Sequence, residues 1–327
     1  MRSFKYILLI PSILCFILYL IKISTNDSSW CKIREEYPFN VNLEFLRRGG
    51  SIHSKYFERA DWIKNEYIHN PLEICLSHGI EILSVVKSSP GNFQNRKAIR
   101  KSWGNSASSH RNRLIFSLGS TSDLTHQIHV DREMEQYEDI LQGTFQDTYK
   151  NLTLKTINSI QWTSRYCSSA KFVLFVDDDV IVNFKNLENF LWQLPLIERE
   201  QLITGYVITE YPSPNRFETK FALSLDEYRH PCYPPYISGP VVVTSGKMVK
   251  LFADAIPYVK PFVFEDVYLG IIASKLGIKL SPVHNHLFDP SGSGVYNWSR
   301  IISSHQGKSM VFEAFKMIVS DLHFVTN

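Results

Sequence analysis

The sequence predicts an α/β fold: a mostly parallel, twisted sheet with helices on both faces. Short apolar runs alternate along the chain with segments whose apolar residues have helical spacing, and such alternation favours a parallel sheet. Residues 172–176 are apolar at every position, which is typical of a strand buried on both faces. With 327 residues and 44% hydrophobic residues, the chain can bury a sizeable core.

The same patterns place the individual elements between residues 79 and 277. We expect strands at residues 80–86, 113–119, 172–176, 201–207 and 236–245, and helices at residues 95–103, 131–137, 152–162, 186–194 and 265–276. Gly277 is a usual stop residue for the last helix. Residues 212–235 are loop-rich and are expected to border the active cleft. His284 and His286 would share one side of a further strand, with a structural or acceptor-side role.

The amino terminus carries an apolar run, residues 6–21, with Arg2 and Lys5 before it and Lys22 after it. This pattern favours an uncleaved membrane anchor with a cytosolic tail and a lumenal body. A signal peptide is the alternative, although no small-x-small cleavage site follows the run. We therefore divide the chain into a tail (1–5), a transmembrane signal-anchor (6–23), a lumenal stem (24–74) and a catalytic domain (75–327).

Charge, sequons and cysteines also indicate a lumenal protein. The basic residues before residue 24 account for the net charge of +3, so nothing in the rest indicates a nucleic-acid partner. Asn26, Asn151 and Asn297 begin N-glycosylation sequons. Four cysteines follow the anchor: Cys31, Cys75, Cys167 and Cys232. Sequence does not choose their pairing; we slightly favour Cys167 with Cys232, and leave open that all four are unpaired.

Three carboxylates, Asp177, Asp178 and Asp179, directly follow the buried strand at residues 172–176. They would repel one another unless a cation lay among them, and open α/β sheets bind ligands just outside this end of a strand. Mg²⁺ and Mn²⁺ are commonly held by one or two carboxylates plus substrate phosphates. The alternative is an acidic turn that caps the next element. The preceding strand favours a site for a metal and a phosphorylated ligand.

Six blocks in order resemble the β1,3-galactosyltransferase family, which includes β1,3-N-acetylglucosaminyltransferases and, more distantly, Fringe. The resemblance covers roughly residues 78 to 310 of the chain. The blocks are RKAIRKSWG (96–104), EQYEDILQGTFQDTYKNLTLKT (135–156), FVDDDV (175–180), YPPYISG (233–239), FEDVYLG (264–270) and RIISSHQ (300–306). The chain departs from many members at Ile237, where they carry a cysteine, so the usual disulfide there is in doubt.

The resemblance implies a GT-A glycosyltransferase of the Golgi membrane with type II orientation. Such an enzyme would use Mn²⁺ and a UDP-sugar donor to add a hexose, galactose or an N-acetylhexosamine, in β1,3 linkage with inversion. The acceptor would be a glycan on a glycoprotein or glycolipid; whether the chain forms a homo-oligomer is left open. The alternative function is a catalytically silent lumenal protein that binds glycans or assists another transferase.

The resemblance also implies roles for single residues. Asp179 and His305 would bind the metal, while Asp177 or Asp178, our two further donor-binding candidates, would contact the ribose or a metal-bound water. A histidine ligand suits Mn²⁺ better than Mg²⁺. The alternative for His305 is an ordinary surface histidine.

Inversion requires one base to take the proton of the acceptor hydroxyl, and Asp266 is our candidate, with Glu265 as its competitor. Asp266 opens a helix, so a purely structural role is the alternative. Arg96 and Arg100 lie four residues apart and would share a helix face in the nucleotide pocket. The alternative for these arginines is a solvated basic face.

Overall fold

The structure is a computed structural model that describes residues 43–50, 60–62, 66–76, 79–108, 111–210, 212–217, 220–292 and 297–306. The predicted anchor at 6–23, Asn26 and Cys31 lie outside these residues. No helix within the described ranges is long and apolar enough to cross a membrane. The chain divides into two units, and the larger one, residues 41–209 with 234–327, holds the predicted α/β domain.

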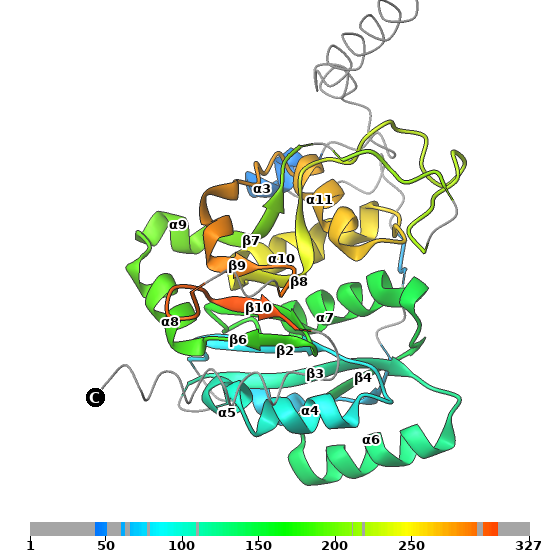
Figure 1. Cartoon of the computed structure of the whole chain (residues 1–327), viewed down its shortest axis with the longest axis vertical. Helices are drawn as coiled ribbons and strands as arrows, with labels where there is room; N and C mark the ends of the chain where they lie inside the picture. The colour runs from blue at the N-terminus through cyan, green and yellow to red at the C-terminus, as the bar shows by residue number, and fades with distance from the viewer. Residues whose placement is uncertain are drawn as a thin grey trace, which may run out of the picture. The chain divides into compact units, whose positions relative to one another are not determined.

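A seven-stranded sheet forms the frame of the larger unit (Figure 1). Its spatial order is β1 (Tyr67–His69), β4 (Ile140–Gln146), β3 (Arg113–Ser120), β2 (Ile82–Lys87), β5 (Phe172–Asp177), β8 (Tyr236–Ser245) and β7 (Ile203–Ile208). The four strands from β4 to β5 are parallel, whereas β1, β8 and β7 pair antiparallel with their neighbours. The α/β class is confirmed, but the sheet is mixed rather than mostly parallel. Strand direction was missed because a strand buried on both faces is apolar throughout in either direction.

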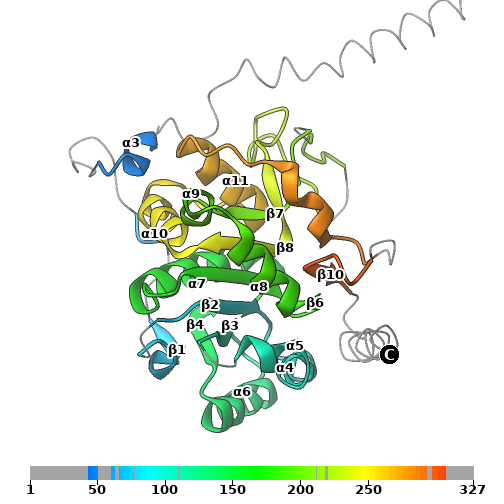
Figure 2. The ribbon, with the colours of Figure 1, turned by 90° about the vertical axis from the view of Figure 1, so that its left-hand side faces the viewer.

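Helices cover both faces of the sheet. One face packs against α4 (Phe93–Arg100), α5 (Trp103–Ala107), α6 (Leu124–Tyr137) and α8 (Phe184–Gln193). The strands send alternate side chains to the opposite face, which packs against α7 (Leu152–Tyr166), α10 (Gly246–Ala255) and α11 (Glu265–Lys275). Figure 2 shows α4, α5 and α6 gathered near β3 and β4, with α10 and α11 near β7 and β8.

The remaining helices are short. They are α3 (Glu44–Arg47), α9 (Leu196–Glu200) and the 3₁₀ turns η1 (Leu72–Cys75), η2 (Tyr149–Asn151), η3 (Ile256–Tyr258) and η4 (Pro282–Leu287).

A second, three-stranded sheet places the chain's last described residues beside the predicted aspartate turn. In it, β10 (Ser303–His305) lies between β6 (Val180–Val182) and β9 (Phe288–Asp289). β10 is antiparallel to β6, with His305 opposite Val180. This small sheet therefore brings His305 next to Asp179.

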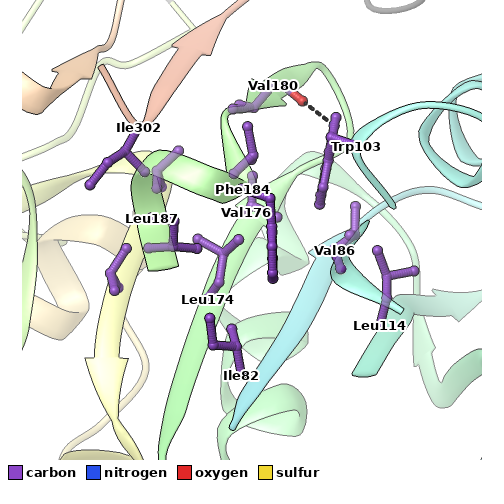
Figure 3. Packing of buried hydrophobic residues seen from close by; sticks show 14 of the residues in the cluster. Ile82, Val86, Trp103, Leu114, Leu174, Val176, Val180, Phe184, Leu187 and Ile302 are labelled. Carbon is purple, nitrogen blue, oxygen red and sulfur yellow. Dashed lines mark hydrogen bonds between the residues drawn. The ribbon is translucent and has the colours of Figure 1, made fainter. Parts of the chain in front are cut away.

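The start of β6 is also tied to the apolar core. The indole of Trp103 donates to the carbonyl of Val180 (3.1 Å) within the apolar cluster drawn in Figure 3.

The predicted elements are confirmed in most places and differ at a few boundaries. The helix predicted at 95–103 is two helices, because the chain turns at residues 101–102 between α4 and α5. Helix α6 begins earlier than expected, where the side chain of Asp123 accepts from the amides of Thr125 and His126. Strand β4 was not predicted. Gly277 follows α11 with a φ of +66°, as a stop residue should.

Two predictions about cysteine and histidine are wrong. Cys167 pairs with Cys75 rather than with Cys232, at a Cα–Cα distance of 5.1 Å. Cys167 precedes β5 and so lies at its amino end, away from the aspartates that motivated our choice. Cys232 is also disulfide-bonded, so the cysteines of the described chain are not free thiols. His284 and His286 lie in η4 rather than on a strand.

The smaller unit includes residues 210–233, whose described part contains neither helix nor strand. Arg216 organises this segment by donating to the carbonyls of Leu223, Ser224, Tyr228 and His230. The prediction of a loop-rich segment is confirmed. Its proposed position beside the cleft stays a prediction.

Candidate active site

Asp177 ends β5, and the turn that follows carries Asp178 and Asp179 into β6. On the neighbouring strand β2, Lys87 lies directly opposite Asp177. Its carbonyl accepts from the amide of Asp178 (3.1 Å). The three aspartates therefore project from the carboxyl end of the parallel strands, where α/β sheets bind ligands. Each one has a different partner.

Asp178 faces the protein interior and is 5% exposed. Its Oδ2 accepts from the hydroxyl of Ser88 (2.6 Å) and the amide group of Asn92 (2.9 Å), and its Oδ1 accepts from Asn95 (3.4 Å). Three donors satisfy a buried carboxylate that would otherwise be costly. Asp178 therefore shapes the turn.

Asp177 is paired with a lysine that sequence analysis missed. The ammonium of Lys87 lies 2.8 Å from Asp177 and 3.4 Å from Glu265, and it donates to the carbonyl of Gly239 (2.9 Å). Burial alone would lower the pKa of Lys87, but the charges of Asp177 and Glu265 outweigh burial and raise it above its ordinary value. Lys87 is thus a permanent cation that joins the aspartate turn to the start of α11.

Asp179 faces His305, with Nε2 3.3 Å from Oδ1. The amide of Gln306 donates to the carbonyl of Asp179 (2.8 Å), and Nδ1 of His305 lies 3.2 Å from the carbonyl of Pro290. The hydrogen bond to Asp179 raises the pKa of His305, although partial burial opposes it. The predicted pair is therefore brought together across β6 and β10.

A glycine makes this approach possible. Gly292 has a φ of +61°, and a Cβ there would collide with the carbonyl oxygen of His305. The loop before it is held by Asp289, which accepts from the amides of Ser291 (3.2 Å) and Gly292 (3.1 Å). Asp289 also accepts from the hydroxyl of Ser304 (2.8 Å), so it ties this loop to β10.

The donor set of Asp179 and His305 fits one hard or borderline divalent cation. Two ligands at right angles around a small cation lie about 3 Å apart, close to the observed separation. Within the described ranges, no group of three or more His, Cys, Asp and Glu side chains could hold a metal ion. With Asp179 and His305 as two ligands, phosphate oxygens and water would complete the coordination, as is usual for Mg²⁺ and Mn²⁺ sites with phosphorylated substrates.

The second acidic group opens α11. Burial, and to a lesser extent the charge of Glu265, raises the pKa of Asp266 to about 7. Its Oδ1 accepts from the amide of Val267 (2.7 Å), which partly offsets the shift. Glu265 instead lies next to Lys87. Of the two candidates, Asp266 therefore has the protonation behaviour of a general base near neutral pH.

The two predicted donor-binding arginines are occupied by protein partners. Arg96 is 0% exposed and pairs with Glu133 (2.6 Å). Arg100 pairs with Glu133 (2.7 Å) and Asp139 (2.7 Å), and its guanidinium lies over the ring of Tyr137, 4.1 Å from the centroid. The alternative of a solvated basic face is wrong for both arginines. Their predicted contact with the nucleotide stays untested, and their observed role is to cross-link α4 to α6.

Two further buried charges were missed although they lie inside a quoted block. Lys155 donates to the carbonyl of Ser88 and lies 3.1 Å from Asp147. Asp147 in turn accepts from the amide of Gly119 (2.7 Å). The helix around Lys155 buries polar as well as apolar residues, so no clear signal in the sequence pointed to this link. The partner of that lysine could not be read from the sequence.

Two of the predicted sequons are described. Asn151 precedes α7 and donates to the carbonyl of Gln146 (2.9 Å). Asn297 is exposed, and its side chain accepts from the hydroxyl of Ser299 (2.8 Å). Glycosylation at these positions stays a prediction.

Comparisons with known proteins identify the family of the chain. Residues 94–284 match the family model described as Galactosyltransferase. The β-1,3-galactosyltransferase brn of Drosophila melanogaster is 34% identical over 238 residues, covering 72% of either chain. Lactosylceramide 1,3-N-acetyl-β-D-glucosaminyltransferase A of Xenopus laevis is 28% identical over 322 residues, covering 93% of this chain and 84% of the relative. Among solved structures, the galactosyltransferase LgtC aligns with a TM-score of 0.36 and 11% identity over 73% of this chain and 95% of its own, too slight a likeness for inference.

The family match therefore defines the chain as a glycosyltransferase, built on a mixed α/β sheet. The chain belongs to the galactosyltransferase family, because the family model matches more than half of it. This confirms the predicted family, and with it glycosyl transfer as the class of reaction.

Proposed function

We propose that this chain transfers a hexose, galactose or an N-acetylhexosamine, from a UDP-sugar to a hydroxyl of a glycan acceptor on a glycoprotein or glycolipid. The product would carry a β1,3 linkage, formed with inversion on a GT-A type fold. One observation carries the proposal: a facing Asp179–His305 pair and a partly buried Asp266 border the same end of the sheet, and Lys87 links their neighbours Asp177 and Glu265.

The first half of this arrangement suits the donor. Asp179 and His305 would hold Mn²⁺, which when bound would neutralise the negative charge that develops on the departing diphosphate. Asp177 lies at the mouth of the turn, with 31% of its side chain exposed, and would contact the ribose or a metal-bound water. Asp178, held by Ser88, Asn92 and Asn95, would keep the turn in shape.

The second half suits the acceptor. The carboxylate of Asp266 would take the proton from the attacking hydroxyl, which requires a base with a pKa near the working pH. Its hydrogen bond from Val267 fixes the orientation of the carboxyl group. Glu265 is paired with Lys87, so Asp266 is the carboxylate at this position without a cationic partner to hold it ionised.

The setting of the reaction follows from the amino-terminal segment. An anchor at residues 6–23 would make the chain a type II membrane protein of the Golgi with a lumenal catalytic domain, in keeping with the three sequons and the disulfide. A lumenal position is also where Mn²⁺, UDP-sugars and glycan acceptors would meet.

A screen of the purified full-length chain tests the proposal. UDP-galactose, UDP-N-acetylglucosamine and UDP-N-acetylgalactosamine would each be offered with a panel of glycolipid and glycoprotein glycans, with Mn²⁺ and with excess chelator. Transfer of one sugar in β1,3 linkage, only with metal, is expected. Binding of glycans without transfer from any donor would instead support the silent glycan-binding alternative.

A further inference from the structure

Arg96 has no hydrogen-bond donor left for a ligand. A guanidinium carries five N–H donors. In Arg96, Nε and Nη2 donate to Glu133 (2.9 and 2.6 Å), Nη1 donates to the hydroxyl of Ser88 (3.1 Å) and the carbonyl of Ser89, and Nη2 also donates to the carbonyl of Pro90 (3.1 Å). Because the side chain is 0% exposed, all five donors serve the protein interior.

One of these bonds leads directly to the aspartate turn. The Ser88 hydroxyl accepts from Arg96 and donates to Oδ2 of Asp178 (2.6 Å). A hydroxyl has a single proton. Because Arg96 can only donate, the proton of Ser88 must point towards Asp178. The arginine thereby fixes the direction of the serine–aspartate hydrogen bond.

The backbone around Ser88 is held as firmly as its side chain. Lys155 donates to its carbonyl, and its amide donates to the carbonyl of Ser117 (3.0 Å) on β3. On the far side, Glu133 is shared between Arg96 and Arg100. Burial would raise the pKa of Glu133, but the hydrogen bonds and charges of the two arginines lower it below its ordinary value. Glu133 therefore stays charged and keeps Arg96 in place.

We propose that Arg96 and Ser88 are positioning residues for the donor site: through the Ser88 hydroxyl, Arg96 sets the orientation of Asp178 and with it the turn that presents Asp177 and Asp179. The nucleotide is then recognised by the turn and not by the arginine. This inference rests on the proposed function, because it assumes that the turn binds the donor.

A double-mutant cycle separates this role from direct contact. Ser88→Ala, Arg96→Lys and the double variant of the full-length chain are compared by calorimetric titration with UDP in Mn²⁺, and by kcat/KM for the donor. Each single change should weaken UDP binding about 10-fold, as is usual when a partner of a ligand-binding side chain is lost. The double variant should bind UDP as well as the single variant with the lower affinity, because both changes break the same link.

Arg111→Lys is the matched control. Arg111 lies at the surface, 57% exposed, and is paired with Glu81. This change should leave UDP binding and turnover as in the wild type. Ser88→Ala removes a single hydroxyl, so it tests the inference even if Arg96→Lys fails to fold.

Two results would overturn the inference while the proposed function stands. In the first, wild type transfers sugar and Ser88→Ala binds UDP as tightly as wild type. In the second, the losses from Ser88→Ala and Arg96→Lys multiply in the double variant, as they would if the arginine contacted the donor itself. Absence of metal-dependent transfer by the wild type would instead overturn the proposed function, and this inference with it.

Discussion

The two acidic groups of the site differ in how their charges are balanced. In the turn after β5, Asp177 has an ammonium partner and Asp179 an imidazole partner. At the start of α11, Asp266 has a backbone amide and a second acid, Glu265, beside it. In the sequence alone, the five carboxylates of these two groups cannot be told apart by their surroundings.

This difference explains how carboxylates can serve both for binding the donor and for proton transfer within one site. A cationic partner favours the ionised form of a carboxylate, which suits cation or donor binding, whereas burial beside another acid raises its pKa and suits proton transfer. Burial also raises the pKa of Asp177, but there the charge of Lys87 opposes the shift. Lys87 lies between the groups and contacts both. We therefore expect substitutions in the two groups to damage different steps.

The largest effect is expected for Asp179→Asn. It removes one of the two proposed metal ligands, and kcat/KM should fall about 1,000-fold or more, with loss of metal-dependent UDP binding. Enzyme kinetics and UDP titration measure the two quantities. Asp254→Asn, which changes an exposed partner of Lys250, is the control and should be neutral. UDP binding unchanged in Asp179→Asn would rule out its role as a ligand.

Asp266→Asn should affect the chemical step only. Loss of the general base should lower kcat about 100- to 10,000-fold while UDP binding stays within about twofold of wild type. Glu265→Gln is the informative comparison, because it should retain far more activity. If Asp266→Asn lost UDP binding as well, its role would be structural; if Glu265→Gln were the more damaged variant, Glu265 would be the base.

The pH dependence of the wild type gives a third, smaller effect. Asp266 acts as a base only when deprotonated, so kcat/KM should rise about tenfold per pH unit below a midpoint near its pKa of about 7 and level off above it. Glu265→Gln removes a negative charge that raises this pKa and should move the midpoint to lower pH. Lys87 also acts on Asp266 and lowers its pKa, whereas the neighbouring Tyr149 and Tyr236 have their own pKa values raised by the charge of Asp266. A midpoint unchanged in Glu265→Gln would contradict the assignment.

The smallest effect concerns the glycine beside His305. Gly292→Ala and Gly49→Ala both place alanine at positive φ, which costs about 1–2 kcal/mol in free energy of unfolding. A Cβ at position 49 meets open space, whereas one at 292 meets the carbonyl of His305. Gly292→Ala should therefore be the less stable variant and the only one to lose UDP affinity. Equal losses in thermal unfolding would show that the loop is not tightly packed there.

Much of the site was predictable because its residues lie at recognisable places along the chain. The apolar run before Asp177 identified a buried strand, and the order of the blocks pointed to Asp179, His305 and Asp266. Lys87 was missed because its importance depends on the pairing of β2 with β5, which places it opposite Asp177. Register between strands far apart in sequence is a tertiary property that a single sequence does not encode locally.

The same reason explains the errors in the fold. The solvated face considered as the alternative for Arg96 follows from a run of basic residues, but Arg96 pairs in the interior with Glu133, 37 residues away. The disulfide partner of Cys167 lies 92 residues away, at the amino end of the sheet. The direction of β8 is set by its antiparallel pairing with β5 and β7. The spacing of apolar residues identifies a helix or strand, but it does not show which other element packs against it.

A titration of UDP into the purified full-length chain tests most directly whether a cation at the aspartate turn holds the nucleotide. It would be run once with Mn²⁺ and once with excess chelator. We expect saturable binding with Mn²⁺ and none with chelator. Equally tight binding in the two titrations would contradict the account, because Asp179 and His305 would then have no cation to share with the diphosphate.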